Sequence, residues 1–179
     1  MSESPTEDIT LSKPVIEMAT VANELCYFFD TVENKDKESI LRFIQPILPL
    51  LYLKGSLLPN VSPQNPEVNE RFVTEEQWEK VFTVLRDKFG KDDEYWIIDP
   101  QYINETEPLK ASLSENIADI YQDMKDFILL MQKNTLAARE NAISECSLLL
   151  ANHWGYRVGN IFTRVHHLLY YDEEISTPY

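Results

Sequence analysis

Apolar residues recur at steps of three and four positions through most of this chain, the spacing that places side chains on one face of an α-helix. The first such stripe contains Val15, Met18, Ala22, Leu25, Phe29 and Val32. Residues 74–89, 112–134 and 137–171 carry similar stripes, and we identify no strand in the pattern. The 179 residues, 44% of them apolar, are enough to form one hydrophobic core. We therefore expect an all-α fold, a single-domain bundle of five or six helices over residues 1–179.

Local signals mark the ends of two of these helices. Thr74 followed by Gln77, and Ser112 followed by Glu115, have the spacing of a capping box, which satisfies free backbone N–H groups at a helix start. Gly90 is placed to end the helix that begins at Thr74, because glycine readily adopts the left-handed conformation that follows many last turns. These signals predict helices over 74–89 and 112–134.

Residues 37–58 are apolar on nearly every side, which predicts a central helix. Pro46 and Pro49 lie inside this pattern, and each removes a backbone donor and clashes with the preceding turn. We expect a kink there, or a break into two short helices. Two long loops follow, at 55–73 and 91–110, because prolines and asparagines interrupt the helical pattern. Tyr95, Trp96 and Ile97 are expected to anchor the second loop to the core.

Composition narrows the classes of function and the location. The net charge of −14 repels phosphate backbones and anionic lipids, so we expect no nucleic-acid and no membrane partner. Cys26 and Cys146 lie in apolar helical stretches and are expected to be buried free thiols. The first residues lack the pattern of a secretory signal and no apolar run approaches the ~20 residues of a membrane span, which favours the cytoplasm. Residues 1–12 and 172–179 are expected to be flexible tails.

The segment 137–171 carries the most polar and unusual residues of the chain. On a helical wheel its apolar stripe contains Ile143, Leu150, Trp154, Val158, Ile161, Val165 and Leu168. A second face carries His153, Arg157, Asn160, Arg164 and His167. Gly155 and Gly159 share a third face, where two glycines weaken a helix by ~1 kcal/mol each. We interpret this glycine pair as a notch that lets another helix pack closely.

The helix at 112–134 presents acids that could meet this polar face. Asp119 and Asp123 lie on it, and together with His153, Arg157 and Asn160 they define a candidate polar cleft. Desolvated groups of this kind occur at functional sites, but structural ion-pair networks contain them too. Both interpretations stay open from the sequence.

Motifs for other chemistries are missing. His153 and Arg157 do not form the i, i+4 histidine pair of a zinc-binding helix, and a guanidinium repels a cation. The chain has no glycine-rich phosphate loop and no G-x-S-x-G nucleophile turn. We expect no metal ion and no cofactor.

Several strings resemble a known family. "SLSENIADIYQDMKDFI" and "ANHWGYRVGNIFTRVHHLL", with "DDEYWIIDP" upstream, are similar to segments of a bacterial family called domain of unknown function 5063. The resemblance implies a helical cytoplasmic domain with no established activity. Asp119, Asp123 and His153 match the family pattern, as do Trp154 and Gly155. Arg157 and Asn160 stand where that pattern has a histidine and an acid, so a site here would favour an anionic or hydrogen-bonding group over a cation.

These observations lead to two hypotheses of function. The first is a non-enzymatic module that binds a protein partner or forms a homodimer, because the chain is acidic and helical and lacks catalytic motifs. The second is a small-molecule- or metal-binding enzyme whose cleft lies between the helices at 112–134 and 137–171. In that case the carboxylates would be bases or ligands, His153 an acid–base group and Arg157 an anion clamp.

Overall fold

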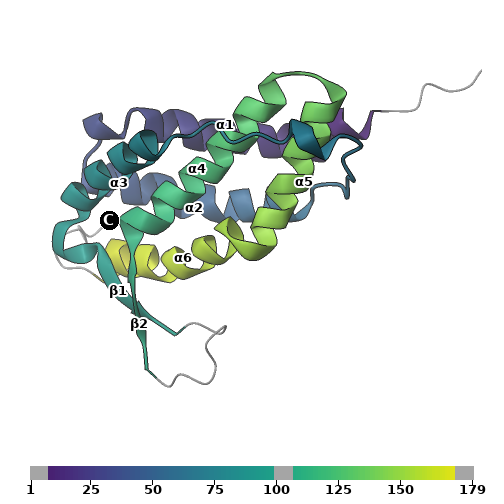
Figure 1. Cartoon of the computed structure of the whole chain (residues 1–179). Helices are drawn as coiled ribbons and strands as arrows, with labels where there is room; N and C mark the ends of the chain where they lie inside the picture. Colours follow the sequence, from purple (N-terminus) through teal and green to yellow (C-terminus); the bar gives the residue numbers. More distant parts are fainter. Residues whose placement is uncertain (1–7, 99–106, 172–179) are drawn as a thin grey trace, which may run out of the picture.

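The computed structural model describes residues 8–98 and 107–171, and within these ranges the protein is all-α with one small hairpin (Figure 1). Six α-helices are present in the described part of the chain: α1 Lys13–Asp30, α2 Lys37–Ser56, α3 Glu75–Phe89, α4 Leu113–Gln132, α5 Leu136–Asn152 and α6 Trp154–Tyr170. The predicted fold class and the upper predicted number of helices are confirmed.

The helix α4 lies at the centre of the bundle. It contacts α1, α3, α5 and α6, whereas α2 packs against α1, α5 and α6. One hydrophobic core joins these elements, with Leu25, Leu51, Met124 and Trp154 among its fully buried members. The capping box predicted at the start of α3 is complete, because Thr74 and Gln77 form both reciprocal hydrogen bonds. At the start of α4 one of the two predicted bonds is present, in which the Ser112 hydroxyl accepts from the Glu115 N–H.

The expectation that the second helix is enclosed on all sides is wrong. Leu50, Leu53 and Leu57 of the α2 region are 38%, 51% and 52% exposed, because α2 lies at the outside of the bundle and its neighbours cover one side. The helix also runs through Pro46 and Pro49 without dividing in two. Both prolines are exposed, so water can reach the carbonyl groups that lose their helical donors.

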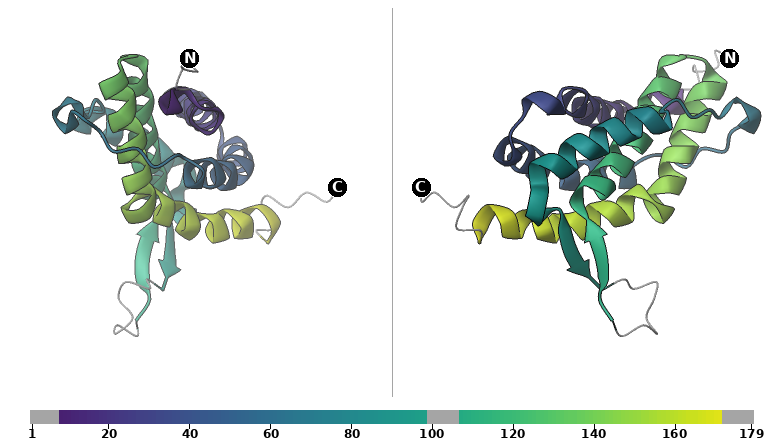
Figure 2. Two further views of the ribbon diagram at one scale, coloured as in Figure 1. Left: turned by 90° about the vertical axis from the view of Figure 1, so that its right-hand side faces the viewer. Right: turned by 60° about the vertical axis from the view of Figure 1, so that its left-hand side comes forward.

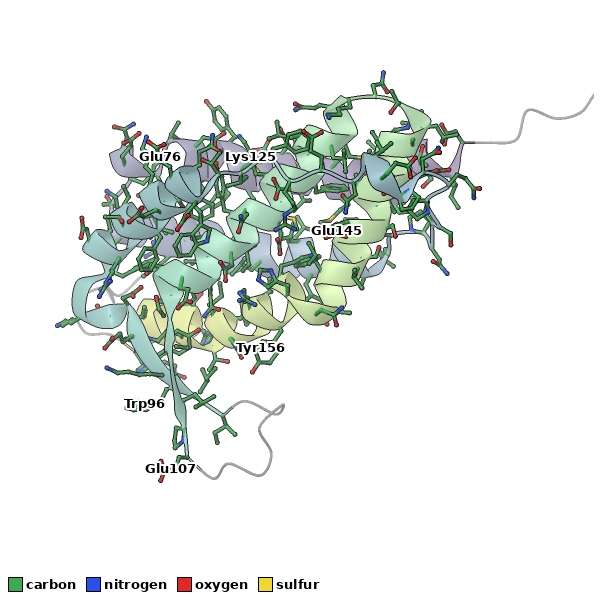
Figure 3. All side chains as sticks on the ribbon, viewed as in Figure 1. Glu76, Trp96, Glu107, Lys125, Glu145 and Tyr156 are labelled. Carbon is green, nitrogen blue, oxygen red and sulfur yellow. The ribbon has the colours of Figure 1, made fainter. Side chains whose placement is uncertain are left out.

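The second predicted loop contains a β-hairpin that the sequence analysis missed. Strand β1, Glu94–Ile97, pairs antiparallel with β2, Leu109–Ser112, and the hairpin extends away from the helices in every view (Figures 1 and 2). Strands of four residues are too short for an alternating pattern to stand out. Tyr95 is buried and anchors the hairpin as expected, but Trp96 is 66% exposed, as its position on the outer side of β1 shows (Figure 3).

The last predicted helix is two helices, which corrects the continuous wheel drawn through 137–171. The chain leaves helical geometry at His153, with φ −142° and ψ −85°, and α6 begins at the next residue. Within α6 the predicted apolar stripe is correct, since Trp154, Val158, Ile161, Val165 and Leu168 are all buried. Leu150, on the other side of the bend, is only half-buried.

The two glycines of α6 do not share one notch, because only Gly155 lies close to a residue of another helix, Leu150 of α5. A Cβ atom on Gly155 would lie 2.2 Å from the Leu150 carbonyl oxygen, so this glycine permits the bend between α5 and α6. A Cβ atom on Gly159 would have no neighbour within 4 Å, so this position is open. The close approach between helices occurs instead at Gly55 of α2, where a Cβ atom would lie 2.4 Å from the buried ring of Trp154.

Part of the predicted flexible amino-terminal tail is packed against the bundle. Ile9–Leu11 form a 3₁₀ turn, and Thr10 is buried. Arg139 of α5 donates to the Thr10 hydroxyl at 2.8 Å and to Asp8 at 2.8 Å, which attaches residues 8–12 to the core. The remainder of that tail, 1–7, and the predicted tail 172–179 lie outside the described residues, as does Asp99-Pro100 of the second loop.

Two glycine substitutions should have opposite effects on stability. Gly55→Ala is expected to lower the free energy of unfolding by about 1–3 kcal/mol, because the new methyl group overlaps the Trp154 ring in a packed core. Gly159→Ala is expected to raise it by about 0.5–1 kcal/mol, because alanine favours a helix and the site is open. Urea unfolding of both variants provides the measurement. Equal effects of the two substitutions would contradict this assignment of the close contact.

Candidate functional site

The two acids predicted on α4 meet the start of α6. His153 Nδ1 lies 2.5 Å from Asp123 Oδ2, and its Nε2 lies 3.9 Å from Asp119 Oδ2. A carboxylate can only accept a hydrogen bond, which assigns the proton to Nδ1. Arg157 Nε donates to Asp119 Oδ2 at 2.7 Å. Four of the five residues proposed for the cleft are therefore in contact, and Asp119 and His153 are within reach of each other.

Arg71, from the segment between α2 and α3, covers the far side of this cluster. Its Nη2 donates to Asp123 Oδ1 at 3.0 Å, and its Nε lies 2.8 Å from Asp126 Oδ2 without hydrogen-bond geometry. Asp126 Oδ1 accepts from the backbone N–H groups of Phe72 and Val73 at 2.7 and 2.8 Å. The buried carboxylates of α4 thus hold a stretch of chain that has no regular secondary structure.

Trp78 of α3 completes the set by donating its indole N–H to Asp119 Oδ1 at 2.8 Å. Both oxygens of Asp119 and both oxygens of Asp123 now have partners within the protein. The hollow beside Arg71, Asp123 and Asp126 has a volume of about 10 Å³, which is no more than one water molecule requires. We call Arg71, Trp78, Asp119, Asp123, Asp126, His153 and Arg157 the aspartate network.

Burial alters the ionisation of several groups near the network. Desolvation is the main reason that the pKa of Asp126 is raised, and the Phe72 and Val73 N–H groups and Arg71 counteract it only in part. Desolvation also raises the pKa of the Cys26 thiol to about 12 and raises the pKa of Cys146. Both cysteines are free and buried, as expected, and thiols with raised pKa values are poor nucleophiles.

Asn160, the fifth residue of the predicted cleft, belongs to a different place. It lines a hollow of about 540 Å³ between β1 and α6, which we call the hairpin groove. The wall from the hairpin consists of Glu94, Tyr95, Trp96, Ile97 and Ile98, and the wall from α6 consists of Gly159, Asn160, Thr163, Arg164 and His167. Asn160 was grouped with His153 because a wheel orders residues by angle but does not show which neighbour each part of the helix meets.

No pattern in the sequence indicates the roles of Arg71 and Trp78 in the aspartate network. Arg71 lies in a polar stretch that was assigned to a surface loop, and no periodicity indicates that its guanidinium turns inward. Trp78 belongs to the apolar stripe of residues 74–89 and is half-buried, but its indole N–H bond to another helix depends on the tertiary arrangement.

The structure also bears on metal sites and membrane spans. In residues 8–98 and 107–171, no group of three or more histidine, cysteine, aspartate or glutamate side chains is arranged to hold a metal ion. Over the same residues, none of the helices has the length and apolar character that crossing a bilayer demands.

The model of a family described as "Domain of unknown function (DUF5063)" matches residues 9–171, nearly all of the chain. This chain belongs to the DUF5063 family. A solved structure with the same fold is the crystal structure of a protein from Bacteroides fragilis, determined as a structural-genomics target. It is 32% identical, the match covers 92% of this chain and 98% of that one, and the TM-score is 0.81. Comparison with curated proteins found no match.

The aspartate network of this DUF5063 protein should contribute measurably to its stability. Asp123→Ala is expected to lower the free energy of unfolding by roughly 1.5–3 kcal/mol, the range for losing a hydrogen bond to a charged group. The value stays below that of a fully buried ion pair because Arg71 is 42% and His153 30% exposed. Glu145→Ala is the control, since Glu145 lies 3.8 Å from Arg71 at the edge of the network. If both variants unfold at the same denaturant concentration, Asp123 does not hold this part of the fold together.

The raised pKa of Asp126 predicts a pH-dependent difference between wild type and Asp126→Asn. A carboxyl group whose pKa is higher in the folded state than its usual value of 3.8 destabilises the fold as the pH rises through that folded-state pKa. Asparagine keeps an oxygen for the Phe72 and Val73 N–H groups but has no charge. The stability of Asp126→Asn relative to wild type should therefore increase as the pH is raised from below 3.8 to neutrality, in chemical unfolding at a series of pH values. A constant difference would contradict the assignment.

Proposed function

We propose that this protein is a non-enzymatic binding module that takes up a protein partner in the hairpin groove. The observation that carries the proposal is the groove itself: about 540 Å³ between β1 and α6, rimmed by two large apolar side chains that the fold leaves in solvent. Trp96 is 66% and Ile98 82% exposed. Exposed aromatic and aliphatic side chains beside polar groups are typical of the energetic centre of a protein interface.

The alternative of an acid–base enzyme would use the pair Asp119 and His153. Asp119 and His153 are 3.9 Å apart, so reach alone does not rule out cooperation. Both oxygens of Asp119, however, accept hydrogen bonds from Trp78 and Arg157, and His153 Nδ1 bonds to Asp123. The hollow beside Arg71, Asp123 and Asp126, at about 10 Å³, is too small for an organic molecule. These features favour a structural role for the aspartate network.

The charge of the chain favours a different protein as partner over a second copy. Two chains of net charge −14 repel each other at long range, whereas a basic partner is attracted. The buried free thiols of Cys26 and Cys146 fit a reducing compartment, and we propose a cytoplasmic location in a bacterium.

The groove can be altered from both of its walls. Trp96→Ala removes the apolar rim on β1, and Gly159→Leu fills the groove from α6 at a position where a side chain meets nothing within 4 Å. Leu53→Ala is the control, because Leu53 is an exposed apolar residue of α2 that does not line the groove. The four immobilised proteins are incubated with lysate of the source organism, and each retained protein is quantified by mass spectrometry.

We expect a specific protein to be retained by wild type and by Leu53→Ala, with a loss of roughly tenfold or more in both groove variants, as for interface residues of high energetic importance. Retention that is equal in all four samples would overturn the proposal, and so would the absence of any specific protein. Light scattering of the purified chain gives the oligomeric state, and a dimer that Trp96→Ala dissociates would show that the groove binds a second copy instead.

A further inference from the structure

The groove runs along the edge of β1 and not over one face of the hairpin. Side chains of successive strand residues point to opposite faces. A hollow that contacts five consecutive residues, Glu94 to Ile98, must therefore follow the strand edge. Since β2 occupies one edge of β1 in the described sheet, the groove lies on the other edge.

The pairing with β2 shows which backbone groups point into the groove. Leu113 N–H donates to Asp93 C=O at 2.8 Å, and these two residues continue the register that pairs Glu94 with Ser112. Hydrogen-bonded and non-hydrogen-bonded pairs alternate in an antiparallel ladder. Tyr95 and Ile97 therefore bond to β2, whereas the N–H and C=O groups of Glu94 and Trp96 point outward. Within the described residues, no hydrogen bond engages those outward groups of Trp96.

The wall from α6 meets the edge of β1 at the base of the hairpin, because the hairpin extends away from the helices (Figure 2). Gly159 adds no side chain to this wall, while Asn160 and Thr163 supply polar groups. Arg164 Nη2 reaches Asp92 only at 3.3 and 3.4 Å.

We propose that the partner adds an extended segment to the free edge of β1, as a third strand of the hairpin whose end near the bundle meets α6. This inference rests on the proposed function and specifies how the groove is used. Main-chain hydrogen bonds to Trp96 would give affinity, and alternate side chains would give selectivity. One set of side chains packs on Trp96 and Ile98 and is apolar or β-branched. At the end of the segment nearest the bundle, a side chain that meets Asn160, Thr163 and Arg164 carries a hydrogen-bond acceptor such as Asn, Ser or Thr.

Two variants of Trp96 distinguish the contribution of its main-chain N–H group to binding from that of its side chain. Trp96→Ala removes the indole but keeps the N–H group, whereas Trp96→Pro removes both. The Trp96 N–H points away from β2, so proline there removes no bond of the ladder, and it is tolerated at a strand edge in that orientation. Random linear octapeptides displayed on phage are selected on the wild-type chain, and the enriched peptide is synthesised as the probe. We expect its affinity for Trp96→Pro to be about tenfold or more below that for Trp96→Ala.

Methylation of the probe provides a test that does not depend on the folding of a variant. Each backbone nitrogen of the peptide is methylated in turn, and binding to wild type is measured by calorimetry. A third strand requires alternation: methylation of every second nitrogen should weaken binding by about tenfold or more, and methylation of the intervening ones should change it little. An equal effect at every nitrogen, no effect at any, or no enriched peptide would overturn strand addition.

The two proposals fail in distinguishable ways. If Trp96→Ala and Gly159→Leu abolish retention of the protein partner while the methylated peptides show no alternation, docking in the groove stands and strand addition falls. If those two variants retain the partner as wild type does, the groove is not the docking site.

Discussion

Two buried aspartates of α4 connect parts of the chain that lie far apart in the sequence. Asp123 holds Arg71 of the α2–α3 segment and His153 at the α5–α6 bend, and Asp126 binds the backbone of residues 72 and 73. A buried carboxylate without partners is strongly unfavourable, so each of these contacts is required by the others. Because α4 contacts four other helices, this network also sets where α6 leaves the bundle. The groove depends on it, since α6 forms one wall.

The aspartate network shows that a short distance between acid and base groups does not by itself indicate a catalytic site. His153 lies near two carboxylates and an arginine, a combination that occurs in active sites. Here both oxygens of Asp119 and both oxygens of Asp123 have partners within the protein, and the hollow beside Arg71, Asp123 and Asp126 holds about one water molecule. A larger hollow, the hairpin groove of about 540 Å³, lies elsewhere, beside the exposed Trp96. Its lining includes none of the seven residues of the aspartate network.

The edge of β1 that is not paired with β2 borders the hairpin groove. An unpaired edge with outward N–H and C=O groups tends to pair with another chain, and proteins usually protect such edges. In this protein α6 passes the base of the hairpin, and Gly159 leaves the space beside β1 open. A strand added to that edge would run along β1, away from the bundle. Figure 2 shows the hairpin extending from the side of the bundle where α6 runs.

The sequence alone determined the local structure and most of the buried surface: helix period predicted the stripes of α1, α4 and α6, and side-chain caps predicted the starts of α3 and α4. It also indicated that Asp119 and Asp123 share a face able to meet His153. Tertiary structure decided the rest, because periodicity describes one element at a time. Three features depend on which elements meet. These are the contact of Arg71 with Asp123, the close approach at Gly55 but not at Gly159, and the position of Asn160 in the groove. The bend at His153 had the largest consequence, since one residue outside helical geometry redirects every side chain that follows it.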